Sequence, residues 1–210
     1  ANLAVVGPSG AGKTALCRVL AGLWKRPTGS ITLPSATDGK PSLLIVPQTP
    51  LILTAPASFR ELVTYPTLLD DVSWTKAKPT LTHDINRLNL GVLLEREGWN
   101  AVKAWDQTLS VGESQSLAIV RLLFHQPRLA ILDNCLYGVS DEVSACVYSL
   151  LEERNVRVIT CTQRLSPAAL RYHGRELRLG ESTLSGWSEH RARVVDDGAR
   201  KEDKDRQQTD

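Results

Sequence analysis

The feature that most constrains the fold of this chain is an eight-residue segment that fits the pattern G-x-x-x-x-G-K-[ST], namely Gly7, Pro8, Ser9, Gly10, Ala11, Gly12, Lys13 and Thr14. An apolar run at 3–6 precedes it, and a stretch with helical apolar spacing at 14–23 follows. In a strand–loop–helix unit of this kind the loop N–H groups wrap a polyphosphate at the helix N-terminus. Lys13 would reach the β- and γ-phosphates, and Thr14 would give a hydroxyl to Mg²⁺. The alternative is a flexible glycine loop with an exposed lysine, which the flanking strand and helix disfavour.

The rest of the chain alternates between predicted strands and helices. Apolar runs at 43–46, 129–132 and 156–159 indicate buried strands, and helical patterns cover 110–125 and 141–153. Ser110 and Ser140 are suited to cap these helices. Residues 67–105 indicate a mostly helical lobe, and 176–187 indicate a hairpin. The pattern predicts the α/β class, with a mostly parallel sheet flanked by helices and ligands at the carboxyl ends of its strands.

Composition sets limits on partners and compartment. A net charge of +2 is too small to favour nucleic acid. The four cysteines are far apart, without a C-x-x-C pair, which favours a reducing compartment over a zinc site or disulfides. We find neither a signal peptide nor an apolar run long enough to cross a bilayer. Because its first residues already form a core strand, we expect the chain to be a fragment of a longer protein. The charged residues 189–210 are predicted to be a disordered tail.

The segment LAILDNC at 129–135 places an acid at the end of a buried strand. Asp133 would hold the magnesium ion of a bound nucleotide, directly or through water. Its alternative role is to cap the following turn. Many ATPases have a glutamate at the next position to activate water, whereas this chain has Asn134.

Two further motifs indicate which P-loop family the chain resembles. Gln48 follows a buried strand, and the segment LSVGE at 109–113 precedes Asp133 by about two dozen residues. A P-loop, a glutamine loop, an LSGGE-like signature and an acid-ending strand in this order resemble the cassette domain of ATP-binding cassette (ABC) proteins. The resemblance implies a P-loop NTPase fold of ABC type with ATP and Mg²⁺ as cofactors. It adds Gln48 as a metal and catalytic contact.

Longer segments, including LEREGWNAVKAWDQTLSVGE and RYHGRELRLGESTLSGW, resemble subfamily D, the peroxisomal fatty acyl-CoA half-transporters of the adrenoleukodystrophy-protein type. The resemblance implies a cassette over 1–188 that lacks its N-terminal strands, with a helical signature lobe at roughly 55–126. The membrane domain, which binds the acyl substrate, and the adenine-stacking residue would precede Ala1. The cassette would lie on the cytosolic side of the peroxisomal membrane. A second half-transporter would complete the site, and the signature residues Ser110, Val111, Gly112 and Glu113 would contact the partner's ATP.

Three positions depart from the family pattern. Val111 replaces the first signature glycine, which costs little if the backbone φ is negative there. Asn134 stands at the general-base position, where an amide can accept a hydrogen bond from water but cannot take its proton. Gln163 stands where the family has a histidine that contacts the γ-phosphate. The segment at 137–140 is also altered. We therefore expect ATP to be bound here but hydrolysed slowly. The second half-transporter could be a copy of this chain, but the altered site favours a heterodimer.

Other functions remain open at this level. A regulatory ATP-binding pseudoenzyme would bind ATP without turnover, and a soluble ABC ATPase would act without a membrane domain. A small-molecule kinase would leave the signature and Gln48 without a role. Trp99 and Trp105 are expected to anchor the packing of the helical lobe rather than to bind a ligand.

Overall fold

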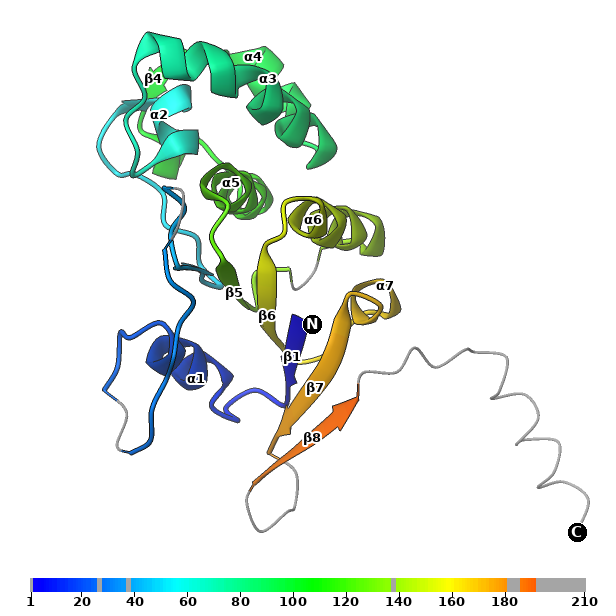
Figure 1. The fold of residues 1–210 in the computed structure, drawn as a ribbon. Coiled ribbons are helices and arrows are strands. Elements are labelled where there is room, and N and C mark those ends of the chain that lie inside the picture. Colours follow the sequence, from blue (N-terminus) through cyan, green and yellow to red (C-terminus); the bar gives the residue numbers. More distant parts are fainter. Residues whose placement is uncertain (1, 26–27, 37–38, 137–138, 181–185, 192–210) are drawn as a thin grey trace, which may run out of the picture.

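The computed structural model describes residues 2–25, 28–36, 39–136, 139–180 and 186–191 of the chain (Figure 1). The strands are β1 (Asn2–Val6), β2 (Leu43–Val46), β3 (Ala57–Ser58), β4 (Val102–Lys103), β5 (Leu129–Asp133), β6 (Arg157–Thr162), β7 (His173–Leu179) and β8 (Trp187–Arg191). The helices are α1 (Lys13–Leu20), α2 (Phe59–Thr64), α3 (Asp71–Arg87), α4 (Gly91–Glu97), α5 (Val111–His125), α6 (Asp141–Glu153) and α7 (Pro167–Leu170), with a 3₁₀ turn at Trp105–Gln107.

The main sheet has the strand order β2-β5-β6-β1-β7-β8. All neighbours pair in parallel except β7 and β8, which form the predicted antiparallel hairpin. The P-loop strand β1 lies between β6 and β7. Because β1, β5 and β6 run in parallel, the carboxyl ends of β5 and β6 lie at the same edge of the sheet as the P-loop, which follows β1. This mostly parallel sheet with flanking helices confirms the predicted α/β fold class.

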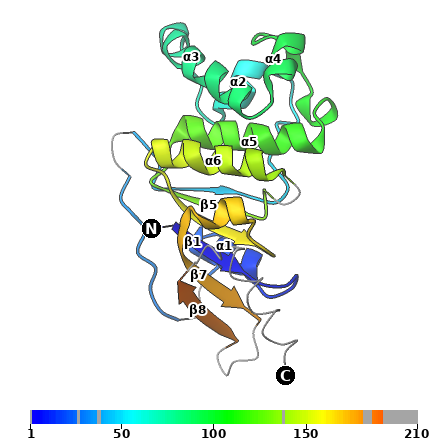
Figure 2. The ribbon, with the colours of Figure 1, turned by 90° about the vertical axis from the view of Figure 1, so that its right-hand side faces the viewer.

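Helices cover the two faces of the sheet unequally. Helix α1 lies on one face, whereas α5, α6 and α7 lie on the other (Figures 1 and 2). Alternate side chains of β5 point to opposite faces of the sheet. Ile131 packs with Val5 and Cys17 in a small cluster, whereas Ala130 and Leu132 belong to the large cluster with α5 and α6. A strand that is buried on both sides has a continuous apolar sequence, which is why β5 could be predicted from the sequence.

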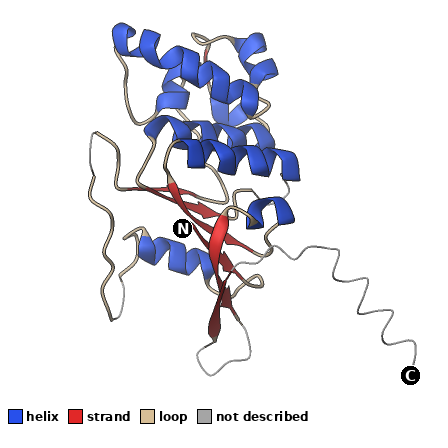
Figure 3. Ribbon diagram, turned by 45° about the vertical axis from the view of Figure 1, so that its right-hand side comes forward, coloured by secondary structure: helices blue, strands red, loops and turns tan. Residues whose placement is uncertain are grey.

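A helical lobe, formed by α2, α3 and α4, stacks on the outer side of α5 (Figure 3). Its centre is aromatic. Trp105 is fully buried, and its Nε1 donates to the carbonyl oxygen of Ala57 at 2.7 Å. Trp99 packs edge-on against Trp74, with ring centroids 4.8 Å apart, and lies 5.6 Å from Phe59. Trp99 and Trp105 therefore anchor the packing of the lobe, as predicted. No helix of the described segments is long and apolar enough to span a bilayer.

The ends of two elements differ from the sequence-based expectation. Helix α1 ends at Leu20 rather than at Leu23, because Gly22 has a φ of 73° and the backbone closes in a Schellman motif. The N–H of Gly22 donates to Val19, and that of Leu23 donates to Arg18. Strand β8 extends to Arg191, past the predicted boundary at 188, since pairing with β7 satisfies the backbone of these charged residues. The remainder of the predicted tail, 192–210, lies outside the described residues.

Candidate functional site

A cavity of about 260 Å³ gathers most of the predicted site residues at the carboxyl ends of the parallel strands. Its lining comprises the P-loop and first-helix residues Ser9, Gly10, Gly12, Lys13, Thr14 and Ala15, together with Gln48, Asp133, Asn134 and Gln163. These positions are as much as 154 residues apart in the chain, and the parallel topology brings them to one edge of the sheet. The arrangement offers phosphate-binding and oxygen-donor groups within one cavity.

The P-loop wraps tightly at the start of α1. The Lys13 ammonium group donates to the carbonyl oxygens of Gly7 and Pro8, both at 2.7 Å, and its side chain is nearly buried. An added Cβ on Gly7 would lie 2.6 Å from the Leu179 carbonyl oxygen, so only glycine fits between the loop and β7. Gly12, with a φ of 92°, precedes α1 and gives it no side-chain cap, which leaves the first N–H groups of the helix open to an anion.

A hydroxyl and a carboxylate meet beside the loop. Thr14 Oγ1 donates to Asp133 Oδ1 at 3.2 Å, and Asp133 is 4% exposed at the end of β5. The Gln48 amide lines the same cavity from the end of β2. Oxygen donors of this kind, together with phosphates and waters, are the ligands that Mg²⁺ prefers. The residues present therefore fit a Mg²⁺–nucleotide site.

The backbone at Asn134 is in the left-handed region, with a φ of 52°. Its N–H donates to the Cys161 carbonyl oxygen at 2.7 Å, which ties the end of β5 to β6. Asparagine tolerates this conformation better than most residues, so Asn134 turns the chain after the strand. Its Oδ1 is buried and has no hydrogen-bond partner among the described residues. A side chain that lines the cavity and also sets a turn is compatible with both roles.

The two positions that depart from the family pattern, Asn134 and Gln163, line the same cavity. Gln163 follows β6 and lines the cavity that Asn134 also lines. A glutamine at this point can donate a hydrogen bond to an anion but cannot carry a positive charge. Of the segment 137–140, which also departs from the family pattern, Tyr137 and Gly138 lie outside the described residues. Its last residue, Ser140, caps α6 by accepting from the Val143 N–H, as predicted.

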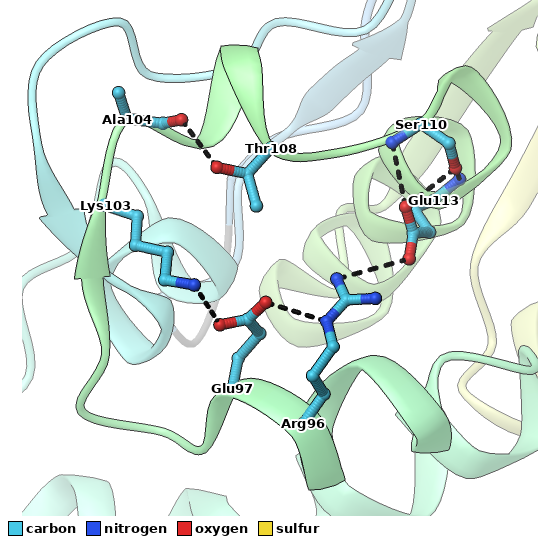
Figure 4. Close-up of polar contacts among 7 residues, drawn as sticks. All are labelled: Arg96, Glu97, Lys103, Ala104, Thr108, Ser110 and Glu113. Atoms are coloured by element: carbon cyan, nitrogen blue, oxygen red, sulfur yellow. Dashed lines mark hydrogen bonds and ion pairs between the residues drawn. The ribbon is translucent and has the colours of Figure 1, made fainter.

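None of the four signature residues is among the residues described above as lining this cavity. They form the exposed start of α5, where Ser110 and Glu113 make a reciprocal capping box (Figure 4). Val111 is the first residue of the helix and has no positive φ, so valine replaces glycine there without backbone strain. Its side chain is 75% exposed. The signature thus presents the N–H groups at a helix N-terminus away from the chain's own P-loop.

One positioning residue was missed in the sequence. Arg121, on α5, is 9% exposed, and its guanidinium donates to the Leu62 carbonyl oxygen at 2.7 and 3.2 Å and to that of Leu51 at 2.8 Å. It holds the segment after Gln48 against the signature helix. The available signal was an arginine among the apolar residues 117–123, where a charge needs partners when buried.

Comparison with known proteins agrees with this geometry. The profile of the family described as "ABC transporter" matches residues 1–137. The chain is 31% identical over 173 residues to ATP-binding cassette sub-family D member 1 of Drosophila melanogaster, which covers 82% of this chain and 23% of that protein. It is 36% identical over 168 residues to ATP-binding cassette sub-family D member 3 of Homo sapiens, covering 79% of this chain and 25% of that protein.

A solved structure of a bacterial Atm1-family ABC exporter with ATP bound shares the fold, with a TM-score of 0.66 and 22% identity over 85% of this chain and 32% of that one. This chain therefore spans about a quarter of the length of these sub-family D relatives. The comparisons confirm the resemblance to subfamily D that the motifs indicated.

Proposed function

Because the chain belongs to the ABC transporter family, we propose that it is the ATP-binding cassette of a membrane half-transporter that moves fatty acyl-CoA or related acyl substrates across the peroxisomal membrane. The observation that carries the proposal is the single cavity that joins Lys13, Thr14 and Asp133 to Gln48 and Gln163. The membrane domain would precede Ala1, with the cassette on the cytosolic side. The similarity to sub-family D members supports this assignment of substrate and membrane.

The residues of the cavity divide the work of nucleotide binding. Lys13 would exchange its two carbonyl acceptors for β- and γ-phosphate oxygens, and the open N–H groups of α1 would add a positive dipole end. Thr14 and Asp133 would hold Mg²⁺, which neutralises phosphate charge, with Gln48 as a further contact. Because these groups are already in place, they would bind ATP without large rearrangement.

The cavity is less well equipped for hydrolysis. Asn134 would orient water without accepting its proton, and Gln163 would contact the γ-phosphate without carrying charge. Much of phosphoryl transfer is positioning and charge stabilisation, so slow turnover would persist. We therefore propose that ATP at this site is bound and hydrolysed weakly.

The signature would act on the ATP of a second half-transporter. Ser110 and the N–H groups at the start of α5 are exposed and lie outside the chain's own cavity, as a contact made in trans requires. In a heterodimer, this signature would complete a competent site on the partner, while this P-loop would form the weak site. ATP would join the two cassettes, and its hydrolysis at the competent site would release them.

The test compares Lys13→Ala with Ser110→Ala in the full-length protein, assembled with its partner and reconstituted in vesicles with an acyl-CoA. We expect Lys13→Ala to abolish ATP binding at this chain with a small loss of turnover, and Ser110→Ala to remove most of the acyl-CoA-stimulated turnover. Equal loss in both variants would contradict the asymmetric arrangement. Turnover without any acyl-CoA stimulation or transport would refute the proposed substrate. ATP binding without turnover in every assembly would instead favour a regulatory pseudoenzyme.

A further inference from the structure

The start of the signature helix is tied to the helical lobe by a chain of four charged side chains (Figure 4). Lys103 Nζ lies 2.5 Å from Glu97 Oε2, and Arg96 Nε donates to Glu97 Oε1 at 2.8 Å. Arg96 Nη2 lies 4.0 Å from Glu113 Oε1, at the third position of α5. The cluster carries two positive and two negative charges and has no net charge.

Glu97 is the fixed point of this cluster. Its side chain is 6% exposed, and the hydrogen bonds from Lys103 and Arg96 hold the pKa of its carboxyl group below the usual range. Arg96, with a side chain 53% exposed, lies between this carboxylate and that of Glu113. Because Glu97 is doubly paired, it orients the Arg96 guanidinium, and the remaining arm of that guanidinium faces Glu113.

The Ser110 hydroxyl is engaged by the same carboxylate. Ser110 Oγ donates to Glu113 Oε2 at 2.7 Å, and the Ser110 N–H donates to that oxygen at 2.8 Å. The Glu113 N–H donates in return to Ser110 Oγ at 3.2 Å. The single hydroxyl hydrogen of Ser110 therefore points at a carboxylate and not outward. To donate to a phosphate, Ser110 must release Glu113, and a negative charge then stays beside the incoming anion.

We propose that Arg96 is a positioning residue for the ATP site completed by this signature, in that it holds the Glu113 carboxylate back and balances its charge while the Ser110 hydroxyl turns to the partner's γ-phosphate. The inference rests on the proposed function. The Ser110 N–H continues to bind Glu113 Oε2 after the hydroxyl turns, and Arg96 approaches Oε1 from its present 4.0 Å. Without Arg96, the helix N-terminus would present an unbalanced carboxylate to the phosphate.

The experiment measures ATP turnover of the full-length protein with its partner, as KM and kcat, for Arg96→Gln, Glu113→Gln and the double variant. Arg96→Gln should raise the KM for ATP about threefold to tenfold, with a smaller change in kcat, as the loss of one balancing charge predicts. Glu113→Gln keeps the acceptor for Ser110 but removes the charge that Arg96 balances, so Arg96→Gln should have little further effect on the KM in a Glu113→Gln background. The double variant should therefore have a KM near that of Glu113→Gln alone. Raising the salt concentration to about 0.5 M should shrink the Arg96→Gln effect, because the side chains of Arg96 and Glu113 are 53% and 27% exposed.

Controls separate positioning from folding. Arg96→Lys retains the charge and should keep a near-normal KM. Arg175→Gln removes an arginine from an exposed pair on the hairpin, where Arg175 Nε lies 2.6 Å from Glu189, and should leave the KM unchanged. An unchanged KM in Arg96→Gln overturns the inference, and so does an Arg96→Gln effect on the KM that is equally large in the wild-type and Glu113→Gln backgrounds. If the wild type shows no turnover with any partner, the proposed function fails instead.

Discussion

The replacement of Asn134 by glutamate, combined with Gln163→His, gives the sharpest test of the proposed slow hydrolysis at this site. The change would return a proton acceptor and an imidazole to the cavity that already contains Lys13, Thr14 and Asp133. General-base assistance is typically worth about 10²–10⁴ in rate, or roughly 2.7–5.4 kcal/mol at 1.36 kcal/mol for each factor of ten. A gain of this size should be visible if the missing carboxylate limits hydrolysis.

The structure also fixes what the change costs. The φ of 52° at Asn134 is a left-handed conformation, which costs an ordinary L-residue roughly 1–2 kcal/mol. The new carboxylate would also stand next to Asp133, which is 4% exposed. We therefore expect the double variant to lose about 1–2 kcal/mol of stability while gaining at least about a hundredfold in hydrolysis rate. A loss of this size is small against the roughly 5–15 kcal/mol by which native proteins are stable, so the variant should remain folded and its faster hydrolysis should be measurable.

The assay is single-turnover hydrolysis of ATP at saturating nucleotide, with the full-length protein assembled with its partner, so that product release does not mask the chemical step. Asn134→Gln with Gln163→His is the matched control, because it carries a similar backbone strain without a carboxylate. We expect this control to lose similar stability and to remain slow. If the glutamate variant is no faster than the glutamine control while ATP still binds, a missing proton acceptor is not what limits this site. Brisk wild-type turnover that Lys13→Ala abolishes would refute the reasoning as well.

Three further outcomes concern the fold. Burial lowers the pKa of His125 and His173 in the folded protein, so the unfolded chain binds more protons there below pH about 6.5. Their contribution to stability is therefore present above this pH and lost as the pH falls toward the folded pKa values, with a slope of at most about 1.4 kcal/mol per pH unit for each, which urea unfolding at several pH values would measure. Asp84→Asn should lower the free energy of unfolding by about 3 kcal/mol, since it leaves the largely buried Arg154 without its carboxylate at 2.6 Å; a double change to leucine should cost less. Cys146 should react with maleimide in the folded protein well before the three other cysteines, which are buried, and mass spectrometry would show equal early labelling if this is wrong.

Much of the sheet could be predicted because several of its strands are continuous apolar runs. The runs at 43–46 and 129–132 matched β2 and β5 to within one residue. Strand β5 is buried on both faces and so has no polar side to confuse the pattern, and the partly buried β2 is also apolar throughout. The helix at 141–153 was likewise given by its capping serine and apolar spacing. The end of α1 was not, because the apolar Leu23 extends the helical pattern past the glycine at 22 that ends the helix.

The site was predictable as a set of residues but not as a geometry. Fixed spacing in the P-loop and an acid after an apolar strand were enough to indicate Lys13 and Asp133. The left-handed backbone at Asn134 has no sequence signal beyond the residue type itself, which also fits a catalytic substitution. The contact of Arg96 with Glu113 depends on how α4 packs beside the start of α5, a tertiary relation that local pattern cannot supply.

Two of the departures from the family pattern, Asn134 and Gln163, concern groups with a proposed role in hydrolysis rather than in nucleotide binding. The residues suited to bind nucleotide keep their chemistry: Lys13 can bind phosphate, Thr14 and Asp133 still meet at 3.2 Å, and α1 still opens its N-terminus to the loop. The two replaced positions, Asn134 and Gln163, are those that would take a proton or carry a positive charge during hydrolysis. In the signature, Val111 replaces a glycine at a position with helical φ, and Ser110 still caps the helix. On the proposed function, this P-loop would retain its ATP, while the start of α5 would contribute to turnover at the partner's site.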